Sequence, residues 1–213
     1  MITIEVTEKV LLGVNVVRGV SVSGNGSDLL AEVAGNLREK YELDDLKVHP
    51  VVRAYRDFYW KIGIDPTKQR PSGEALVRRA LRGKVPSINN VVDAGNAASM
   101  ETFVPIGLYD LDRVKGKLRL RYAREGEQFV PIGGKEERLR GNQIVLADDE
   151  KVLHVFPHRD SKLTMITEET KNVLVVACGV AGVDAETVMK ACSKASEYIV
   201  KLAGGNAEKC VLV

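Results

Sequence analysis

Hydrophobic and polar residues alternate at the start of the chain, with the period of two that turns one face of a strand toward a core. Residues 1–6 (MITIEV) follow this alternation, and residues 11–22 (LLGVNVVRGVSV) are rich in the β-branched side chains that favour strands. The opening of the sequence therefore predicts two strands.

The pattern then changes to the period of a helix. In residues 27–41 (SDLLAEVAGNLREKY), the apolar side chains Leu29, Leu30, Val33 and Leu37 fall on one side of a helical wheel. This spacing predicts an amphipathic helix with one buried face.

Three further segments carry helix signals. We expect a helix over much of residues 44–61 and a short one over 72–82, with Ser72 as its N-cap and Gly83 just after its end. Residues 184–202 begin with a capping aspartate, are followed by two glycines, and predict the last helix.

The centre of the sequence differs from both ends. From about 91 to 176, short β-rich runs are broken by Gly, Pro and Asp-Asp turns. Helices around a β-rich centre are typical of an α+β fold. A length of 213 residues, with 45% hydrophobic and 28% charged residues, suits one domain with a sizeable core. We predict a single α+β domain over residues 1–213.

Composition narrows the functional classes. No apolar run approaches the roughly 20 residues that cross a bilayer, and the first residues lack a signal-peptide layout, so we expect a cytoplasmic protein without a membrane partner. Cys178, Cys192 and Cys210 have neither metal-site nor disulfide-framework spacing. Buried thiols in a reducing compartment are the main expectation, and a reactive thiol is expected at Cys210 if anywhere. No metal or cofactor is predicted.

Basic residues form two clusters although the formal net charge is only +2. In residues 113–122 (RVKGKLRLRY), every second position is basic, which on a strand gives one core face and one face of like charges. An anionic partner would relieve their repulsion, and acidic neighbours on adjacent strands would do the same. The residues concerned are Arg113, Lys115, Lys117, Arg119 and Arg121.

The second cluster lies between residues 61 and 84 and has seven basic residues against two acidic ones, with Arg70, Arg78, Arg79 and Arg82 among them. Several Lys and Arg side chains together bind a phosphate backbone well. Aromatic residues make up only 5% of the chain, which argues against a platform that stacks many bases. Structured RNA recognised by its shape fits better, and no DNA partner is expected.

A polar stretch (FPHRDSKLT) places His158, Asp160 and Ser161 close together in the sequence. A Ser-His-Asp triad is not expected, because adjacent residues of an extended chain point opposite ways and no nucleophile elbow is present. His154 and His158 have no third potential ligand at a spacing typical of a metal site. This stretch is either a structural loop or a loop that presents an arginine and hydroxyls to a ligand.

Residues 88–99 (INNVVDAGNAAS) set three amides and one acid among apolar and very small residues. Buried amides need hydrogen-bond partners. They either satisfy backbone groups of a tight segment or line a site that binds a polar group.

The stretch from RPSGEALVRRALRG through PSINNVVDAGN, LYD and GEQFVPIGG to FPHRD and NVLVV resembles the tRNA-binding and editing domain of the phenylalanyl-tRNA synthetase beta chain. The resemblance covers residues 55–203, whereas residues 1–54 match weakly. It implies the fold of that domain and a pocket that hydrolyses the ester of a wrongly attached amino acid.

The resemblance also suggests roles for single residues. Asn96 matches an asparagine that lines the editing pocket. Asn89, Asn90 and Asp93 are instead expected to hold the backbone of the segment together. Gly107 stands at a histidine position of the family, and Val176 aligns near a glutamate. We therefore expect a pocket that is more apolar at Val176 and roomier at Gly107.

The leading hypothesis is a free-standing protein that hydrolyses mischarged aminoacyl-tRNA without charging tRNA itself. Its candidate catalytic residues are Asn96 together with either His158 or Asp160. The two basic clusters are its candidate RNA contacts. The candidate pocket residues are Asn90, Asp93, Gly95, Gly107, Tyr109, Arg159, Thr164 and Val176. The alternatives are a tRNA-binding module without turnover and an enzyme that acts on a free amino-acid derivative in the same pocket.

Overall fold

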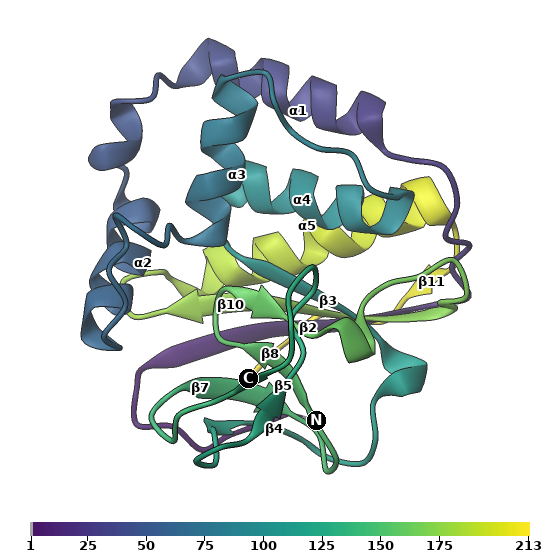
Figure 1. Cartoon of the computed structure of the whole chain (residues 1–213). Helices are drawn as coiled ribbons and strands as arrows, with labels where there is room; N and C mark the ends of the chain where they lie inside the picture. The colour runs from purple at the N-terminus through teal and green to yellow at the C-terminus, as the bar shows by residue number, and fades with distance from the viewer. Residues whose placement is uncertain (1) are drawn as a thin grey trace.

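Helices and sheets are stacked in layers in the computed structural model, which describes residues 2–213 and confirms the α+β fold (Figure 1). The helices of these residues are α1 (Ser27–Lys40), α2 (Pro50–Lys61), α3 (Ser72–Leu81), α4 (Asn90–Thr102) and α5 (Ala185–Ala203). Single helical turns occur at η1 (Asp45–Lys47), η2 (Leu111–Arg113) and η3 (Lys162–Thr164).

Two main sheets carry most of the strands, in orders that interleave distant parts of the sequence. The upper sheet has the order β11 (Asn206–Ala207), β2 (Val10–Arg18), β10 (Asn172–Val180) and β3 (Ile106–Asp110), with β12 (Val211–Leu212) also on β2. The lower sheet has the order β1 (Ile2–Ile4), β4 (Leu118–Tyr122), β7 (Ile144–Ala147), β8 (Val152–Val155) and β9 (Arg159–Asp160). A small ribbon is formed by β5 (Gln128–Phe129) and β6 (Glu137–Arg138).

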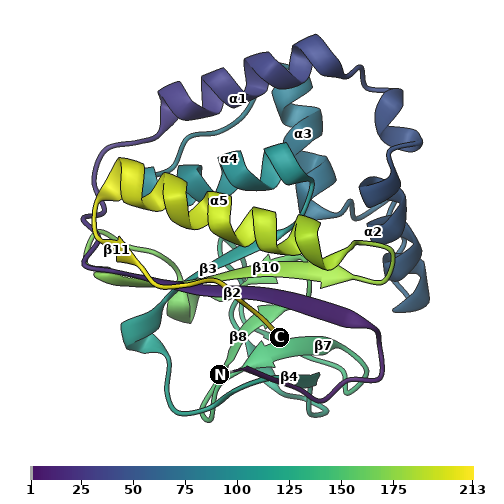
Figure 2. The ribbon, with the colours of Figure 1, turned by 180° about the vertical axis from the view of Figure 1, so that it is seen from behind.

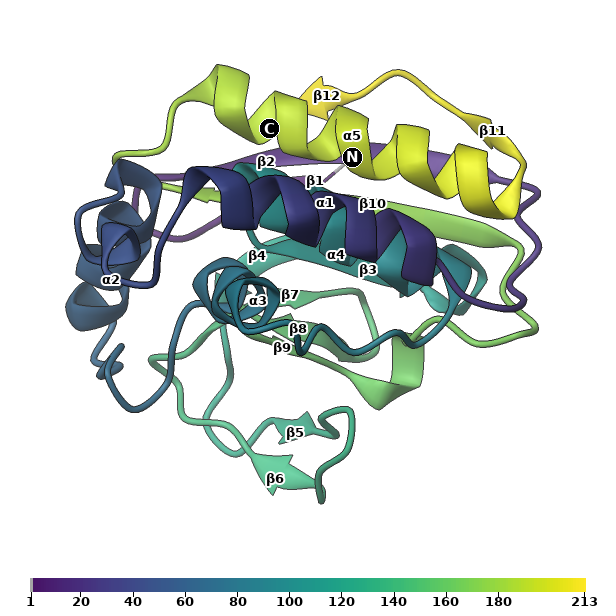
Figure 3. The same ribbon diagram turned by 90° about the horizontal axis from the view of Figure 1, so that it is seen from above.

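The stacking of the layers follows from which faces of the helices and sheets are apolar. Helices α4 and α5 cover one face of the upper sheet, and α1 and α3 lie over α4, as the opposite views of Figures 1 and 2 show. The lower sheet covers the other face of the upper sheet, and the view from above places the β5–β6 ribbon at one side (Figure 3). β10 is covered on both faces, and its sequence (NVLVVACGV) accordingly has no polar side chain after Asn172 except the thiol of Cys178.

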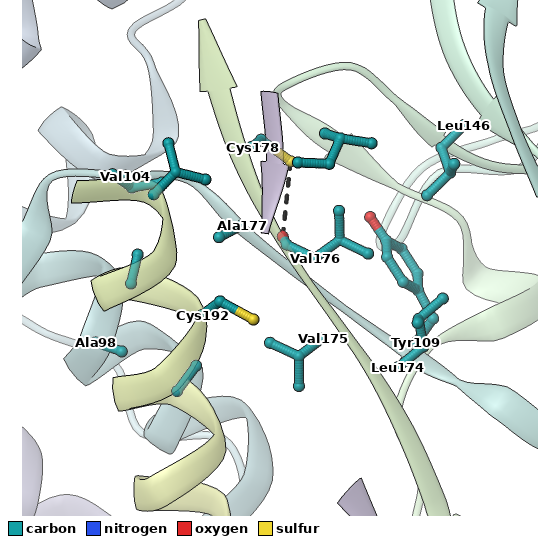
Figure 4. Packing of buried hydrophobic residues seen from close by; sticks show 14 of the residues in the cluster. Ala98, Val104, Tyr109, Leu146, Leu174, Val175, Val176, Ala177, Cys178 and Cys192 are labelled. Atoms are coloured by element: carbon teal, nitrogen blue, oxygen red, sulfur yellow. Dashed lines mark hydrogen bonds between the residues drawn. The ribbon is translucent and has the colours of Figure 1, made fainter. Parts of the chain in front are cut away.

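The main core joins these layers in one cluster of buried side chains. Leu146 of the lower sheet and Tyr109, Leu174 and Val176 of the upper sheet belong to it (Figure 4). A second cluster lies between α1, α3 and α4 and includes Met100.

Several predicted elements are confirmed. The first strand is β1, with Met1 outside the described residues, and the other predicted terminal elements are β2, α1 and α5. Asp184 caps α5 by accepting a hydrogen bond from Thr187 N at 2.7 Å. The helix expected over 44–61 is split into η1 and α2, since Pro50 starts a new helix at its first position.

Other local predictions are wrong. Residues 90–102 form α4 and not β-rich runs, because Asn89 caps the segment and its small residues let it pack closely on α5 and β3. The N-cap of α3 is Pro71 and not Ser72, although α3 does end before Gly83, whose φ is +66°. The strand expected from 113 to 121 begins only at Leu118.

Candidate functional site

A cavity of about 190 Å³ lies where α4 faces β3 and the segment around β9. Its walls are mostly aliphatic, with Asn89, Asn96 and Asp160 as the polar side chains. We call it the α4–β3 pocket. Its lining residues are Ile88, Asn89, Val92, Gly95, Asn96, Ile106, Leu108, Ile132, Asp160, Met165 and Ile166.

The start of α4 is fixed by side chains that bond to the backbone. The Asn89 side chain accepts a hydrogen bond from Val92 N at 2.9 Å and caps the helix. The fully buried Asp93 carboxylate accepts hydrogen bonds from Ile88 N at 2.8 Å, from Gly26 N at 2.9 Å and from the Ser87 hydroxyl. This network satisfies a buried charge and joins α4 to the segment before α1.

Asn90 joins α4 to two other segments of backbone. Its amide donates to the carbonyl oxygens of Ser21 at 2.9 Å and Leu202 at 3.1 Å, and accepts from Ser23 N at 3.1 Å. The expectation that Asn89, Asn90 and Asp93 tie the segment together is thus confirmed. Asn90 and Asp93, also predicted as pocket residues, are buried beside the pocket and do not line it.

Asn96 differs from the other amides of this segment. It lines the pocket, and its side chain makes no hydrogen bond within residues 2–213, so both its donor and its acceptor are available to a bound molecule. Gly95 beside it allows the close approach of α4 to β3, because a Cβ atom there would lie 2.6 Å from Leu108 Cδ1. The predicted pocket residues Asn96 and Gly95 therefore lie on one wall.

Asp160 enters the pocket from the edge of the lower sheet. His154 and Asp160 are register partners on β8 and β9, and His154 Nδ1 lies 2.8 Å from Asp160 Oδ1. His154 is 5% exposed and Asp160 34% exposed. Since a carboxylate only accepts hydrogen bonds, Nδ1–H of the buried imidazole holds Asp160 in place and leaves its second oxygen free.

His154 is a site residue that the sequence patterns did not predict. No motif links it to Asp160, and the two residues face each other only through the β8–β9 register.

The space at Gly107 is filled by Tyr109. A Cβ atom on Gly107 would overlap the Tyr109 hydroxyl, so the prediction of a roomier pocket at Gly107 is wrong. Val176 is the register partner of Gly107 and is buried in the core, and neither residue lines the pocket. Figure 4 shows the Tyr109 ring lying between Leu146 and the β10 side chains.

The Tyr109 hydroxyl is buried and has no hydrogen-bond partner among the described residues. Burial, followed by the charge of Asp160, raises the pKa of Tyr109 well above its ordinary value. The hydroxyl therefore stays protonated, and it is a candidate donor to a group held near Asp160.

His158 and Arg159 line a different cavity, of about 320 Å³, next to the β5–β6 ribbon. Burial, with smaller contributions from the charges of His154 and Arg159, lowers the pKa of His158 to about 3, so this imidazole is neutral near pH 7. Arg159 pairs with Glu137 at 2.6 Å and lies over the Phe129 ring.

Thr164, another predicted pocket residue, is fully buried, and its hydroxyl has no partner within the described residues. It does not line the α4–β3 pocket. The structure therefore brings together Asn96, Gly95 and Asp160 of the predicted site, but not His158, Arg159 or Thr164.

Most charges of the predicted basic strand are paired inside the fold. Arg119 bonds Asp149 at 2.7 Å and Arg121 bonds Glu127 at 2.7 Å. The prediction of one face of five like charges is therefore wrong, and acidic neighbours account for the pattern. Lys115 and Lys117 lie in the turn before β4 and are exposed.

The second basic cluster is divided in the same way. Arg78 is half-buried and paired with Glu74 at 2.7 Å, whereas Arg70, Arg79 and Arg82 are exposed on and around α3. The exposed residues named from these two clusters thus lie in two places, near α3 and before β4.

Two further features of residues 2–213 concern metal binding and membranes. No group of three or more His, Cys, Asp or Glu side chains there is arranged to hold a metal ion. None of the helices in that range combines the length and the apolar character that crossing a membrane requires.

The chain is similar to known proteins over most of its length. The model of the B3/4 domain family matches residues 54–204. A phenylalanine–tRNA ligase beta subunit of Protochlamydia amoebophila is 36% identical over 113 residues, which are 53% of this chain and 14% of that protein. The corresponding subunit of Carboxydothermus hydrogenoformans is 29% identical over 171 residues, 69% of this chain and 21% of that protein.

The fold has a counterpart among solved structures. The crystal structure of an N-terminal fragment of the phenylalanyl-tRNA synthetase beta subunit from Pyrococcus horikoshii superimposes with a TM-score of 0.51 at 18% identity. The match covers 97% of this chain and 50% of that fragment, and at this identity it shows the fold alone. The chain spans only about a fifth or less of the length of the curated relatives named above.

These matches confirm the resemblance inferred from the sequence motifs. The chain belongs to the B3/4 domain family and is a relative of the B3/4 part of phenylalanyl-tRNA synthetase beta subunits.

Proposed function

We propose that this protein hydrolyses the ester bond of mischarged aminoacyl-tRNA that has been charged by another protein, and that the reaction takes place in the α4–β3 pocket. One observation supports this most strongly. An unpaired amide, Asn96, and a carboxylate held by a buried histidine, Asp160, lie on the walls of one small cavity that is otherwise largely aliphatic.

Each group has a chemical task in this proposal. The Asp160 carboxylate accepts hydrogen bonds from the attacking water or from the substrate ammonium group, and His154 keeps it oriented. The Asn96 amide donates to the ester carbonyl oxygen, where negative charge develops in the tetrahedral transition state. Collapse of that intermediate releases the free amino acid, and the terminal ribose oxygen of the tRNA takes up the proton.

The cavity favours an amino acid with a modest apolar side chain. Ile106, Leu108 and Ile166 provide aliphatic walls, and a volume of about 190 Å³ has no room for a second large group. A polar side chain would leave its hydrogen bonds unmade against these walls, which costs free energy.

The first test is release of amino acids from a panel of tRNAs, each carrying a correct or an incorrect residue, at low salt. Asn96→Ala should slow the selective release about 100-fold, the order expected when one hydrogen-bond donor to the transition state is lost. Asn36→Ala is the matched control, because Asn36 is exposed on α1, outside the pocket, and alanine suits a helix. An unchanged rate in Asn96→Ala would remove Asn96 from the mechanism.

A second candidate is a tRNA-binding module without turnover. It is favoured by His158, whose neutral imidazole faces another cavity, and by Gly107, whose position carries a histidine in the family resemblance. It predicts salt-sensitive retention of uncharged tRNA with no release from any member of the panel. The third candidate, an enzyme of free amino-acid derivatives in the same pocket, predicts turnover without RNA.

A further inference from the structure

The cavity of about 320 Å³ that His158 and Arg159 line has no part in the hydrolysis proposed above. It lies between the chain segment that follows α2 and the segment that joins β6 to β7 (Figure 3). We call it the ribbon cavity, because β6 of the β5–β6 ribbon forms part of its wall. Pockets that bind small molecules measure about 300 to 1,000 Å³, so its size suits a ligand at the lower end of that range.

The charges on the wall of the ribbon cavity are mainly positive. Three arginines and one glutamate line it, and the low pKa of the buried His158 leaves that ring neutral near pH 7. Arg138 donates to the carbonyl oxygen of Gly126 at 3.3 Å and lies 3.8 Å from a carboxylate oxygen of Glu136. The exposed guanidinium of Arg140 makes no ion pair and no hydrogen bond within residues 2–213. An unpaired guanidinium beside a cavity suits a phosphate group, which it can bind through two parallel hydrogen bonds.

Local contacts hold two of these arginines in place. Arg140 N donates to Gln143 Oε1 at 2.8 Å, and Gln143 N donates to the Arg140 carbonyl oxygen at 3.1 Å, so residues 140–143 form a tight turn. Arg159 is bonded to Glu137 at 2.6 Å and lies over the Phe129 ring, and its side chain is 30% exposed. One positive charge is therefore fixed in the wall, and a second one is carried on a rigid turn.

The remaining wall has the groups that hold a nucleobase. Ile62, Ile64 and Phe156 give it an apolar part. The side-chain amides of Gln69 and Asn142 are exposed and make no hydrogen bond within the part of the chain that the structure describes. A side-chain amide offers a donor and an acceptor side by side, which matches the edge of a base. Inorganic phosphate would use only the arginines, whereas a nucleotide would use both parts of the wall.

We propose that the ribbon cavity binds one nucleoside monophosphate unit, with its phosphate on Arg140 and Arg159. The base lies against the apolar part of the wall and directs its edge to the amides of Gln69 and Asn142. The unit is either a free nucleotide or a nucleotide of an RNA chain, since both carry the same phosphate and base.

The ribbon cavity is a neighbour of the α4–β3 pocket. Arg159 lines the first and Asp160 the second, as expected for adjacent residues of a strand. The hairpin of the β5–β6 ribbon likewise contributes Glu137 to the cavity and Ile132 to the pocket. An RNA chain that enters the pocket therefore passes near the cavity. Binding in the cavity breaks no bond, so it does not depend on the hydrolysis proposed for the pocket.

Equilibrium dialysis of the full chain is the first test, with the four ribonucleoside 5′-monophosphates, their nucleosides and inorganic phosphate as probes. At least one nucleotide should bind more tightly, by about 10-fold, than its nucleoside and than inorganic phosphate. Arg140→Gln should weaken that nucleotide about 10-fold, the order expected when a charged hydrogen bond is lost. Arg53→Gln is the matched control, because it removes the same charge from an exposed position of α2 outside the cavity and should leave the affinity unchanged.

A second variant and a map of the wild-type protein locate the ligand. Asn142→Ala should weaken the nucleotide and leave the affinity for inorganic phosphate unchanged. In the wild-type protein, saturation with the nucleotide should shift the amide resonances of residues 62–64 and 140–143 and leave those of α1 in place, a result that requires no variant to fold. Binding of every nucleotide weaker than about 1 mM, equal effects of Arg140→Gln and Arg53→Gln, or shifts confined to other segments would overturn the proposal.

Unacylated tRNA distinguishes the two sources of the nucleotide. Displacement of the bound nucleotide by tRNA at low salt would assign the cavity to a nucleotide of the RNA chain. A nucleotide that stays bound in the presence of tRNA would assign it to a free nucleotide, and both results support the site. These assays contain no ester bond and do not involve Asn96, so failure of the proposed hydrolysis and failure of this site are separate results.

Discussion

At the scale of single residues, Gly107 and Tyr109 are coupled because they compete for the same space. The Tyr109 hydroxyl occupies the volume in which a side chain at position 107 would begin, so only glycine leaves room for this ring. The hydroxyl gains no hydrogen bond in return within the described residues. The space beside position 107 is thus filled by a tyrosine side chain from two residues along β3.

This coupling predicts the effect of refilling position 107. Gly107→Ala should lower the free energy of unfolding by about 2 kcal/mol, since the new methyl group overpacks against Tyr109. Tyr109→Phe should be close to neutral, because it removes a buried hydroxyl that has no partner. Denaturant unfolding at constant m-value measures both changes.

The double variant distinguishes a specific clash from general strain. Gly107→Ala combined with Tyr109→Phe should recover only part of the loss, because the nearest overlapping atom, the hydroxyl oxygen, is gone while the ring carbon Cζ would still lie 2.6 Å from the new methyl carbon. Strictly additive effects of the two substitutions would show that they do not compete for the same space.

At the scale of secondary-structure elements, one buried carboxylate holds helix α3 in place. Glu74 is 1% exposed and bonds Arg56 of α2 at 2.6 Å and Arg78 of its own helix at 2.7 Å. Burial raises the pKa of Glu74, but the hydrogen bonds from Arg56 and Arg78 outweigh it, so the net pKa is lowered. The carboxylate therefore joins two helices only while it is ionised.

The lowered pKa has a definite consequence for stability. A group whose folded pKa lies below its unfolded value near 4.5 contributes stability above that value and loses it as the pH falls through the folded pKa. Glu74→Gln should cost about 3 kcal/mol at pH 7, the lower end for a broken buried ion pair, since both arginines can reach water.

Unfolding of wild type and Glu74→Gln in denaturant from pH 7 to pH 3 measures this dependence. The difference between the two proteins should shrink steadily below about pH 4.5. A difference that stayed constant down to pH 3 would mean that the ionised carboxylate contributes nothing beyond its packing.

The secondary-structure elements also differ in how far the sequence could predict them. Elements with clear periodicity or caps, such as β2, α1 and α5, follow from local rules. Helix α4 does not, because its Val, Asn and Gly residues are poor helix formers and only the packing on α5 and β3 favours the helix. The His154–Asp160 pair depends on strand register, which pairs residues that no motif links.

The charge pattern is organised only at the scale of the whole molecule. The alternating basic residues from 113 to 121 suggested an RNA-binding face, yet Arg119 and Arg121 of β4 are paired with Asp149 and Glu127. Of the basic residues in the two predicted clusters, the exposed ones discussed above lie around α3 in the helical layer and in the turn before β4. A tRNA that contacts both must extend across the layers, which suits a large folded RNA better than a single strand.

This arrangement predicts which substitutions change RNA binding. Arg79→Gln with Arg82→Gln, and Lys115→Gln with Lys117→Gln, should each reduce the slope of log Kd against log salt by about 1 to 2, because each phosphate contact contributes about 0.7 to 0.9. Gel retention of tRNA over a range of salt concentrations measures the slopes.

Arg119→Gln with Arg121→Gln is the control for these pairs, because it removes the same number of charges from side chains already paired within the fold. It should lower stability while leaving the salt slope within error of the wild-type value. If this control changed the slope as much as the exposed pairs do, then binding would open the Asp149 and Glu127 ion pairs, and the face of β4 would belong to the RNA interface after all. If only the α3 pair changed it, the RNA would lie along the helical layer and leave the lower sheet free.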